Sequence, residues 1–289
     1  MDMEKVFPRS TASWNELARI FAYDRTLSAD VREAGIENED GIIIHDISYA
    51  GFSQERIQAF LVEPPGGGPR AGIVFVHPGP ENRSTFLDEA KHMARRGASC
   101  LLIDAPWSDG GRFGSRAIAS SPVELRSWYI QMAVDLRRSL DILETVPPRE
   151  TGRIGFVGHS FGALFGGILA GVEKRITSSV LMAGVGSFSD VAMLNIPDLQ
   201  GGPPVTLREA MDPIDPIHYI GHAPPSAVFF QFGTNDTFFT RQKFLDFSHA
   251  AGEPKLIRWY EADHYLDTTA RNDRIEWLTI NLNLSLKPL

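Results

Sequence analysis

A mostly parallel β-sheet with helices on both faces, an α/β architecture, is the fold class that the sequence predicts. From residue 71 onward, short continuous apolar runs alternate with segments of helical periodicity. Strands that are apolar throughout are typical of a parallel sheet that is covered on both sides. A Gly-x-Ser-x-Gly pentapeptide at residues 158–162 joins one apolar run to a helix rich in small residues, which indicates a nucleophile-bearing turn.

The composition favours one domain and argues against some classes of binding partner. A chain of 289 residues, 43% of them hydrophobic, can bury one large core, so we expect a single domain over 1–289. The net charge of −8 and the lack of a basic stripe argue against nucleic acid or an anionic membrane as the partner. The single cysteine, Cys100, excludes an internal disulfide framework, and no apolar run approaches 18 residues. We therefore expect a soluble, cytoplasmic protein; the oligomeric state is not predicted.

The first quarter of the chain precedes this alternation. Residues 1–40 are mixed and charged, with a helix expected around 14–21, and we interpret them as an N-terminal extension packed on the main domain. Residues 42–49 and 56–63 read as strands on either side of a short polar turn, which predicts an antiparallel hairpin.

The alternating part follows in order. Ser121, Pro122 and Glu124 predict the start of a long helix, with serine as N-cap and proline at the first position. The other expected strands are 72–76, 99–103, 154–157, 177–183, 227–232 and 255–260. The other expected helices are 86–96, the one after residue 162, 242–250 and 268–282.

Residues 184–225 interrupt the alternation after the sixth strand. A long insertion at the carboxyl edge of such a sheet is commonly a lid or cap, although a purely structural excursion is the alternative. Aspartates near His218 and His222 have no regular ligand spacing, so no metal site is predicted.

Three residues at three predicted strand ends suit nucleophilic catalysis. A serine hydroxyl needs a base within hydrogen-bond reach, and that base needs a carboxylate to orient it. In a parallel sheet these side chains lie at the carboxyl ends of strands, in the order Ser, Asp, His. Ser160, Asp236 and His264 match that order. Two rival carboxylates are disfavoured: Asp263 because it adjoins His264, and Asp104 because it precedes the nucleophile.

Acyl transfer also requires donors for the developing oxyanion. One donor is expected to be the backbone N–H of Phe161, directly after the nucleophile. The other should come from the loop after the strand that ends at residue 76. Pro78 and Pro80 have no N–H, so we predict Gly79. His77 is expected to brace this loop.

These motifs resemble the α/β-hydrolase superfamily from Gly72 to the C-terminus, and in particular its dienelactone-hydrolase-like and acyl-esterase branch. The resemblance rests on residues 77–80, 104–106, 158–162, 233–236 and 263–264. It implies an α/β-hydrolase fold with an eight-stranded, mostly parallel sheet and a Ser160–His264–Asp236 triad. Dienelactone hydrolases proper have a cysteine nucleophile where this chain has serine, and Pro78 replaces the usual glycine.

The sequence therefore predicts a serine hydrolase that cleaves small-molecule carboxylic esters through an acyl-enzyme, with no cofactor and no metal. A small peptidase or amidase of the same fold is the nearest alternative, and a hydrolase-fold binding or receptor protein is another. Six aromatic residues in or beside the strand-end loops are candidates for an apolar acyl pocket, with core packing as the alternative: Trp107, Phe113, Trp128, Phe188, Phe238 and Phe239.

Overall fold

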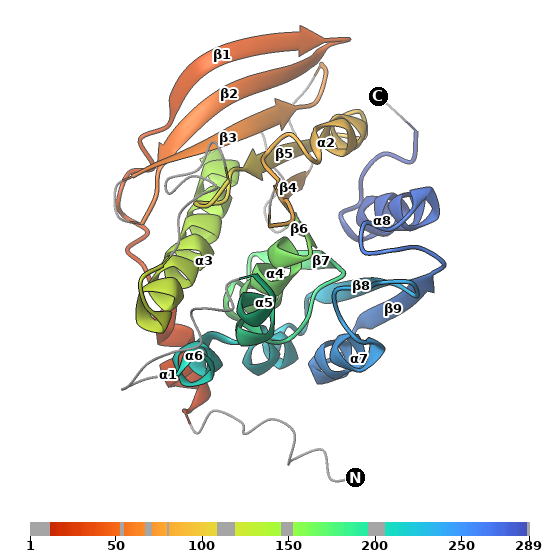
Figure 1. Ribbon diagram of the computed structural model, residues 1–289. Coiled ribbons are helices and arrows are strands. Elements are labelled where there is room, and N and C mark those ends of the chain that lie inside the picture. The colour runs from red at the N-terminus through yellow and green to blue at the C-terminus, as the bar shows by residue number, and fades with distance from the viewer. Residues whose placement is uncertain are drawn as a thin grey trace.

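One sheet, in the order β1-β2-β3-β5-β4-β6-β7-β8-β9, runs through the part of the chain that the computed structural model describes (Figure 1). The described residues are 12–52, 55–66, 71–79, 81–108, 119–145, 153–195 and 206–287. The strands are β1 Arg32–Glu39, β2 Ile42–Ala50, β3 Arg56–Glu63, β4 Ala71–Val76, β5 Ala98–Ile103, β6 Ile154–His159, β7 Ile176–Met182, β8 Ala227–Gly233 and β9 Lys255–Tyr260. The helices are α1 Trp14–Ile20, α2 Leu87–Ala94, α3 Pro122–Thr145, α4 Phe161–Val172, α5 Phe188–Asn195, α6 Leu207–Met211, α7 Arg241–Ala250 and α8 Thr268–Asn281, with short 3₁₀ turns between residues 212 and 222.

Strand direction agrees with the predicted architecture. Strands β1, β2, β3 and β5 pair antiparallel, whereas β5, β4 and β6 to β9 pair parallel. The α/β fold and the antiparallel hairpin at the start of the sheet are thus confirmed. Because parallel strands end at one edge, the loops after β4, β6, β8 and β9 meet there.

The sheet has one strand more than the eight expected. β1, which lies inside the predicted N-terminal extension, is exposed at all eight of its positions. An edge strand with no buried face shows no alternation of apolar and polar residues, so hydrophobic periodicity does not reveal it.

Two apolar clusters fill the two sides of the sheet. On one side, α3, α4 and α7 pack against alternate strand residues such as Val74 and Phe230. On the other side, α2 and α8 pack against the intervening residues, such as Phe75 and Phe229. Helices therefore cover both faces, as the continuous apolar strands indicate. Within the described ranges, no helix has the length and apolarity needed to cross a membrane.

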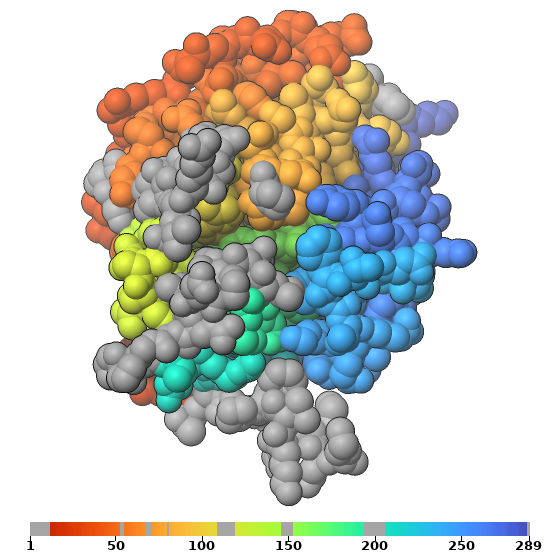
Figure 2. Space-filling model, viewed as in Figure 1, coloured from red at the N-terminus to blue at the C-terminus, as the bar shows by residue number. Residues whose placement is uncertain are grey.

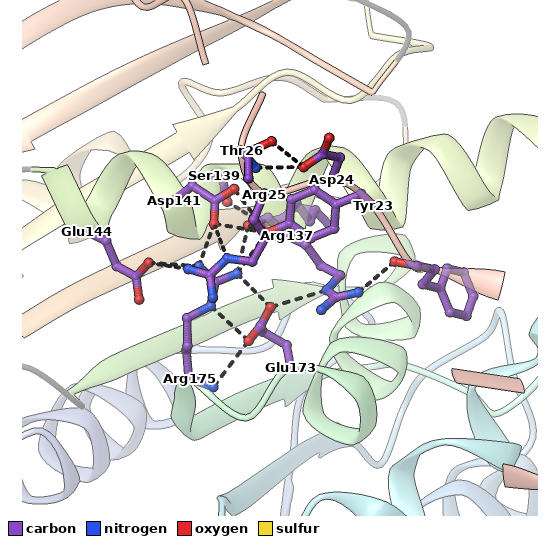
Figure 3. A network of polar contacts seen from close by, with 12 residues as sticks. Tyr23, Asp24, Arg25, Thr26, Arg137, Ser139, Asp141, Glu144, Glu173 and Arg175 are labelled. Atoms are coloured by element: carbon purple, nitrogen blue, oxygen red, sulfur yellow. Dashed lines mark hydrogen bonds and ion pairs between the residues drawn. The ribbon is translucent and has the colours of Figure 1, made fainter. Parts of the chain in front are cut away.

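An ion network fastens the segment after α1 to the main body (Figure 3). The Tyr23 hydroxyl donates to Asp141 on α3 at 2.9 Å, and the Arg175 guanidinium donates to the same carboxylate at 2.6 Å. Arg137 donates to the carbonyl of Phe21 at 2.6 Å. The N-terminal segment is thus held by charged groups from α3 and from the turn before β7.

The second half of the predicted insertion is packed tightly onto the helix that follows the nucleophile. A Cβ added at Gly171 of α4 would lie 2.4 Å from the carbonyl oxygen of Tyr219. The Tyr219 hydroxyl donates to Pro213 at 2.6 Å, and its ring lies edge-on to Phe21 with centroids 5.3 Å apart. The turns around Tyr219 are therefore packed against α4 and the N-terminal segment, while residues 196–205 of the insertion lie outside the described residues.

Candidate active site

Ser160 occupies a strained turn between β6 and α4. Its φ of 52° and ψ of −111° place a non-glycine residue in a region that side chains rarely adopt. A Cβ at Gly158 would lie 2.4 Å from the oxygen of Gly162, and a Cβ at Gly162 would lie 2.4 Å from the oxygen of Val76. Both glycines of the pentapeptide are therefore required by close backbone contacts. The turn matches the strand–turn–helix geometry expected of the motif.

Asp236 and His264, from the loops after β8 and β9, are joined directly. His264 Nδ1 lies 2.6 Å from Asp236 Oδ2, and the two side chains are almost fully buried. The other carboxylate oxygen accepts the backbone N–H groups of Phe238 and Phe239 at 2.8 and 3.2 Å. Burial raises the pKa of Asp236, but the bond from His264 and these two N–H groups outweigh it, so the pKa lies below its ordinary value.

This contact fixes the tautomer of the imidazole. An ionised carboxylate only accepts, so Nδ1 carries the proton and Nε2 keeps its lone pair. The neighbouring carboxylate, Asp263, accepts the backbone N–H of Tyr265 at 2.9 Å. Asp104 accepts the backbone N–H of Arg83 at 2.8 Å. Of the three carboxylates weighed from the sequence, Asp236 is the one bonded to His264.

His159, the residue before Ser160, makes a contact that the sequence did not reveal. Its Nε2–H donates to the backbone carbonyl of His264 at 2.8 Å, and the two rings lie 5.3 Å apart. Burial, followed by the nearby His264, lowers the pKa of His159 to about 4, so the ring is neutral near pH 7. His159 thereby ties the end of β6 to the loop that carries His264.

Ser160 and His264 come from adjoining segments, since the ring of His159 lies beside that of His264, but their side chains are not hydrogen-bonded to each other. Within the described residues, no hydrogen bond joins the Ser160 hydroxyl to the His264 ring. Catalytic hydrogen bonds are often long in ligand-free sites and tighten in the substrate complex. Figure 2 shows the green segments around β6 and α4 near the centre of one face, bordered on the right by the blue segments that follow β8.

Gly79 and Phe161 occupy positions suited to an anion. Phe161 is the first residue of α4, and N–H groups in the first turn of a helix have no partner within the helix. The close contact of Gly162 with Val76 brings the loop after β4 next to this helix end. A Cβ at Gly79 would meet nothing within 4 Å, so the space in front of its backbone is open. Glu81 carries the next backbone N–H along this loop after Gly79, and that N–H donates to the carbonyl of Pro78 at 3.2 Å.

His77 holds the same loop from inside. Its Nδ1 donates to the carbonyl of Pro78 at 2.6 Å, and its Nε2 accepts the backbone N–H of Ala105 at 3.0 Å. Burial lowers the pKa of His77, which keeps the ring neutral. These contacts match the bracing role expected of this histidine.

Aromatic side chains gather beside the Phe161 end of the site. Phe161 packs edge-on against Trp107 and Tyr129, with ring centroids 4.6 and 5.2 Å apart. Phe188 lies 4.7 Å from Tyr129 and is fully buried. Phe188 is thus a core residue as well as a candidate wall of an acyl site.

The other candidates for the acyl pocket lie in different places. Trp128 is only partly buried and packs against the core cluster on the α3 side. Phe238 and Phe239 lie beside His264, with ring centroids 4.5 and 6.2 Å away. Phe113 lies outside the described residues. Among those that are described, no three His, Cys, Asp or Glu side chains cluster as a metal site, and His218 instead contacts Asp212 at 3.2 Å.

Comparisons with known proteins identify the same fold. A family model described as the alpha/beta hydrolase family matches residues 73–279. No curated protein matches the sequence. The acetyl xylan esterase from Paenibacillus sp. R4 is similar over 97% of this chain and 100% of its own, with a TM-score of 0.77 and 16% identity. Acetyl xylan esterase 1 from Thermoanaerobacterium sp. JW/SL YS485 is similar over 96% of this chain and 98% of its own, with a TM-score of 0.78 and 15% identity. A cold-adapted esterase from an Arctic intertidal metagenomic library is similar over 86% of this chain and 99% of its own, with a TM-score of 0.66 and 18% identity.

Proposed function

The chain belongs to the alpha/beta hydrolase family, and from that membership we propose that it is a serine esterase acting on small carboxylic esters through an acyl-enzyme. The observation that carries the proposal is the 2.6 Å bond between His264 Nδ1 and Asp236, made beside a strained Ser160. The resemblance to the dienelactone-hydrolase-like and acyl-esterase branch supports the same function, as does the similarity in fold to three esterases.

In the proposed reaction, the lone pair on His264 Nε2 takes the proton of the Ser160 hydroxyl as the oxygen attacks the ester carbonyl carbon. The carbonyl π electrons move to its oxygen, which accepts from the N–H groups of Gly79 and Phe161. When the carbonyl re-forms, the alcohol leaves and takes the proton from His264. Asp236 stays ionised and stabilises the imidazolium.

Water then repeats these steps against the acyl-enzyme. His264 removes one proton from water, the hydroxyl adds to the acyl carbon, and the carboxylic acid leaves as Ser160 regains its proton. Each half-reaction returns the histidine to its neutral tautomer. In this proposal His264 carries every proton that is transferred, first from Ser160 to the alcohol and then from water to Ser160.

Covalent labelling tests this proposal directly. A fluorophosphonate should add one phosphonyl group to the peptide that contains Ser160, and the Ser160→Ala variant should remain unlabelled. Turnover of acetyl esters by Ser160→Ala should fall by about 10⁴ or more, since loss of the nucleophile removes covalent catalysis. Equal circular-dichroism spectra would show that the variant is folded.

The outcomes separate the competing functions. Hydrolysis of an ester panel with little hydrolysis of matched peptides and amides supports an esterase. Faster amide cleavage would make the chain a peptidase or amidase of the same fold. Failure of both labelling and turnover would leave a binding protein that retains the three residues.

A further inference from the structure

Two large aromatic side chains stand exposed beside the proposed catalytic base. Phe238 is 53% exposed and Tyr265 is 57% exposed. The ring centroid of Phe238 lies 4.5 Å from that of His264, and the ring of Tyr265 lies 5.9 Å away, edge-on. Tyr265 also contacts His159, at 5.7 Å. The proposed mechanism assigns neither side chain a role.

The loops that align the base also hold these two residues. The Phe238 N–H donates to Asp236 at 2.8 Å, and the Tyr265 N–H donates to Asp263 at 2.9 Å. The backbone of each aromatic residue is therefore fixed, although its ring faces solvent. Asp263 thus holds the backbone of Tyr265, the residue after His264, whereas Asp236 is the carboxylate bonded to the His264 ring.

The chemistry of the proposed reaction says what must lie beside these rings. His264 passes its proton to the oxygen of the leaving alcohol, so the alcohol half of an ester lies next to His264. In the same mechanism the carbonyl oxygen lies at the N–H of Phe161, on the side of the site where the buried rings of Tyr129 and Phe188 contact Phe161. The two exposed rings are therefore placed to contact the alcohol half.

We propose that Phe238 and Tyr265 form a binding surface for the alcohol portion of the ester, and that this alcohol carries a ring. The inference rests on the proposed esterase function and deepens it. Aromatic side chains pack best against flat groups, and a rigid ring loses little conformational freedom on binding, unlike a linear chain. Aryl alcohols present a π face to such a surface, and pyranose sugars present a face of C–H groups.

A series of acetate esters tests the surface, because all of them form the same acetyl-enzyme. The probes are benzyl acetate, methyl 6-O-acetylglucopyranoside and n-heptyl acetate, each an ester of a primary alcohol. The value of kcat/KM depends on the steps up to release of the alcohol, and the acetyl group is the same in all three esters. Differences in kcat/KM therefore measure how well each alcohol portion is bound and released. We expect at least one ring ester to exceed the heptyl ester. Phe238→Ala should lower the ratio of ring to heptyl kcat/KM by about fivefold, as aromatic contacts are worth roughly 0.5–1.5 kcal/mol.

Matched variants make the result specific. Tyr265→Ala should also lower the ratio, whereas Tyr265→Phe, which keeps the ring, should restore it for the benzyl ester. Phe52→Ala removes a similarly exposed aromatic, 43% exposed on the turn after β2, and should leave the ratio unchanged. Loss in the sugar arm alone or the benzyl arm alone supports the surface and identifies the ring type.

The proposal is overturned if the heptyl ester is hydrolysed as well as both ring esters while fluorophosphonate labelling is intact. It is also overturned if Phe238→Ala lowers all three rates equally. Absence of labelling together with absence of all three activities overturns the esterase function itself, a result distinct from the other two.

Discussion

The Nε2–H of His159 donates to the backbone carbonyl of His264 at 2.8 Å, so the residue before Ser160 holds the loop that carries His264. Replacing His159 with Phe keeps a ring but removes this donor and leaves a buried carbonyl without its partner. We expect kcat to fall by about tenfold, since a hydrogen bond of this kind is worth about 1–1.5 kcal/mol, and KM to change less.

His159→Gln retains an N–H donor and should recover part of the lost kcat. Steady-state kinetics on one acetyl ester, with melting temperatures for both variants, checks the prediction. Equal kcat values for wild type and His159→Phe would contradict a positioning role.

The Asp→Asn variants at positions 236 and 263 should differ sharply in their effect on turnover. Asp236→Asn places an amide against His264 Nδ1, which favours the tautomer with its proton on Nε2 and removes the base. Turnover should fall by about 10⁴. Asp263→Asn keeps an oxygen that accepts the Tyr265 N–H, so its effect should stay within about tenfold. The reverse ranking in kcat/KM would assign the carboxylate role to Asp263.

A phosphonate adduct of Ser160 would locate the anion site. The phosphonyl oxygen mimics the oxyanion, so the nitrogens of Gly79 and Phe161 should both lie about 2.7–3.1 Å from it in a crystal structure. The Glu81 nitrogen should remain bonded to Pro78, as it is at 3.2 Å here. A Gly79 nitrogen farther than about 4 Å from the phosphonyl oxygen, outside hydrogen-bond range, would show that another donor fills the place.

Phe188, at the start of α5, allows a test of the acyl side. Its ring is buried between Tyr129 and Phe165, with centroids 4.7 and 5.1 Å away. Phe188→Leu should shift the preference among p-nitrophenyl esters toward longer acyl chains, because it shortens a wall beside Phe161. Met193→Ala, on the same helix and 37% exposed, should shift the preference as well if this helix borders the acyl site. A uniform loss across chain lengths in Phe188→Leu would indicate a purely structural residue.

Asp215 predicts a pH effect on stability. It is buried and accepts the Phe188 N–H at 2.7 Å, and burial, with Asp212 and Asp190 nearby, raises its pKa to about 8. Between the ordinary pKa of 3.8 and about 8, the folded state holds a proton that the unfolded state has lost. Asp215 therefore lowers stability progressively as pH rises through this window.

Asp215→Asn keeps an acceptor oxygen and does not ionise. Relative to wild type it should gain stability from pH 4 to pH 8, by at least about 1.4 kcal/mol, the equivalent of one pKa unit. Urea unfolding of both proteins at several pH values measures the difference. A difference that stays constant with pH would show that Asp215 is ionised in the folded protein.

The sequence predicted the features that leave a pattern along the chain. Continuous apolar strands indicated the parallel sheet, and the order of Ser160, Asp236 and His264 at strand ends indicated a site whose last two members are bonded. β1 escaped prediction because its exposed, charged residues carry no periodicity. The roles of His159 and Asp263 depend on which backbone group each side chain meets, and that is decided by how separate loops fold together.

The contacts that fasten the N-terminal segment also set an order of events during synthesis. Tyr23 meets Asp141, 118 residues later, and Arg175, 152 residues later, while the Tyr219 hydroxyl reaches the carbonyl of Leu17 across 202 residues. A ribosome adds roughly 5–20 residues per second, so the segment from Leu17 to Tyr23 is synthesised roughly 6 s or more before these partners. During that interval the Tyr23 hydroxyl and the Leu17 carbonyl lack these partners. The segment from α1 to Tyr23 is thus secured only after much of the later chain has been made.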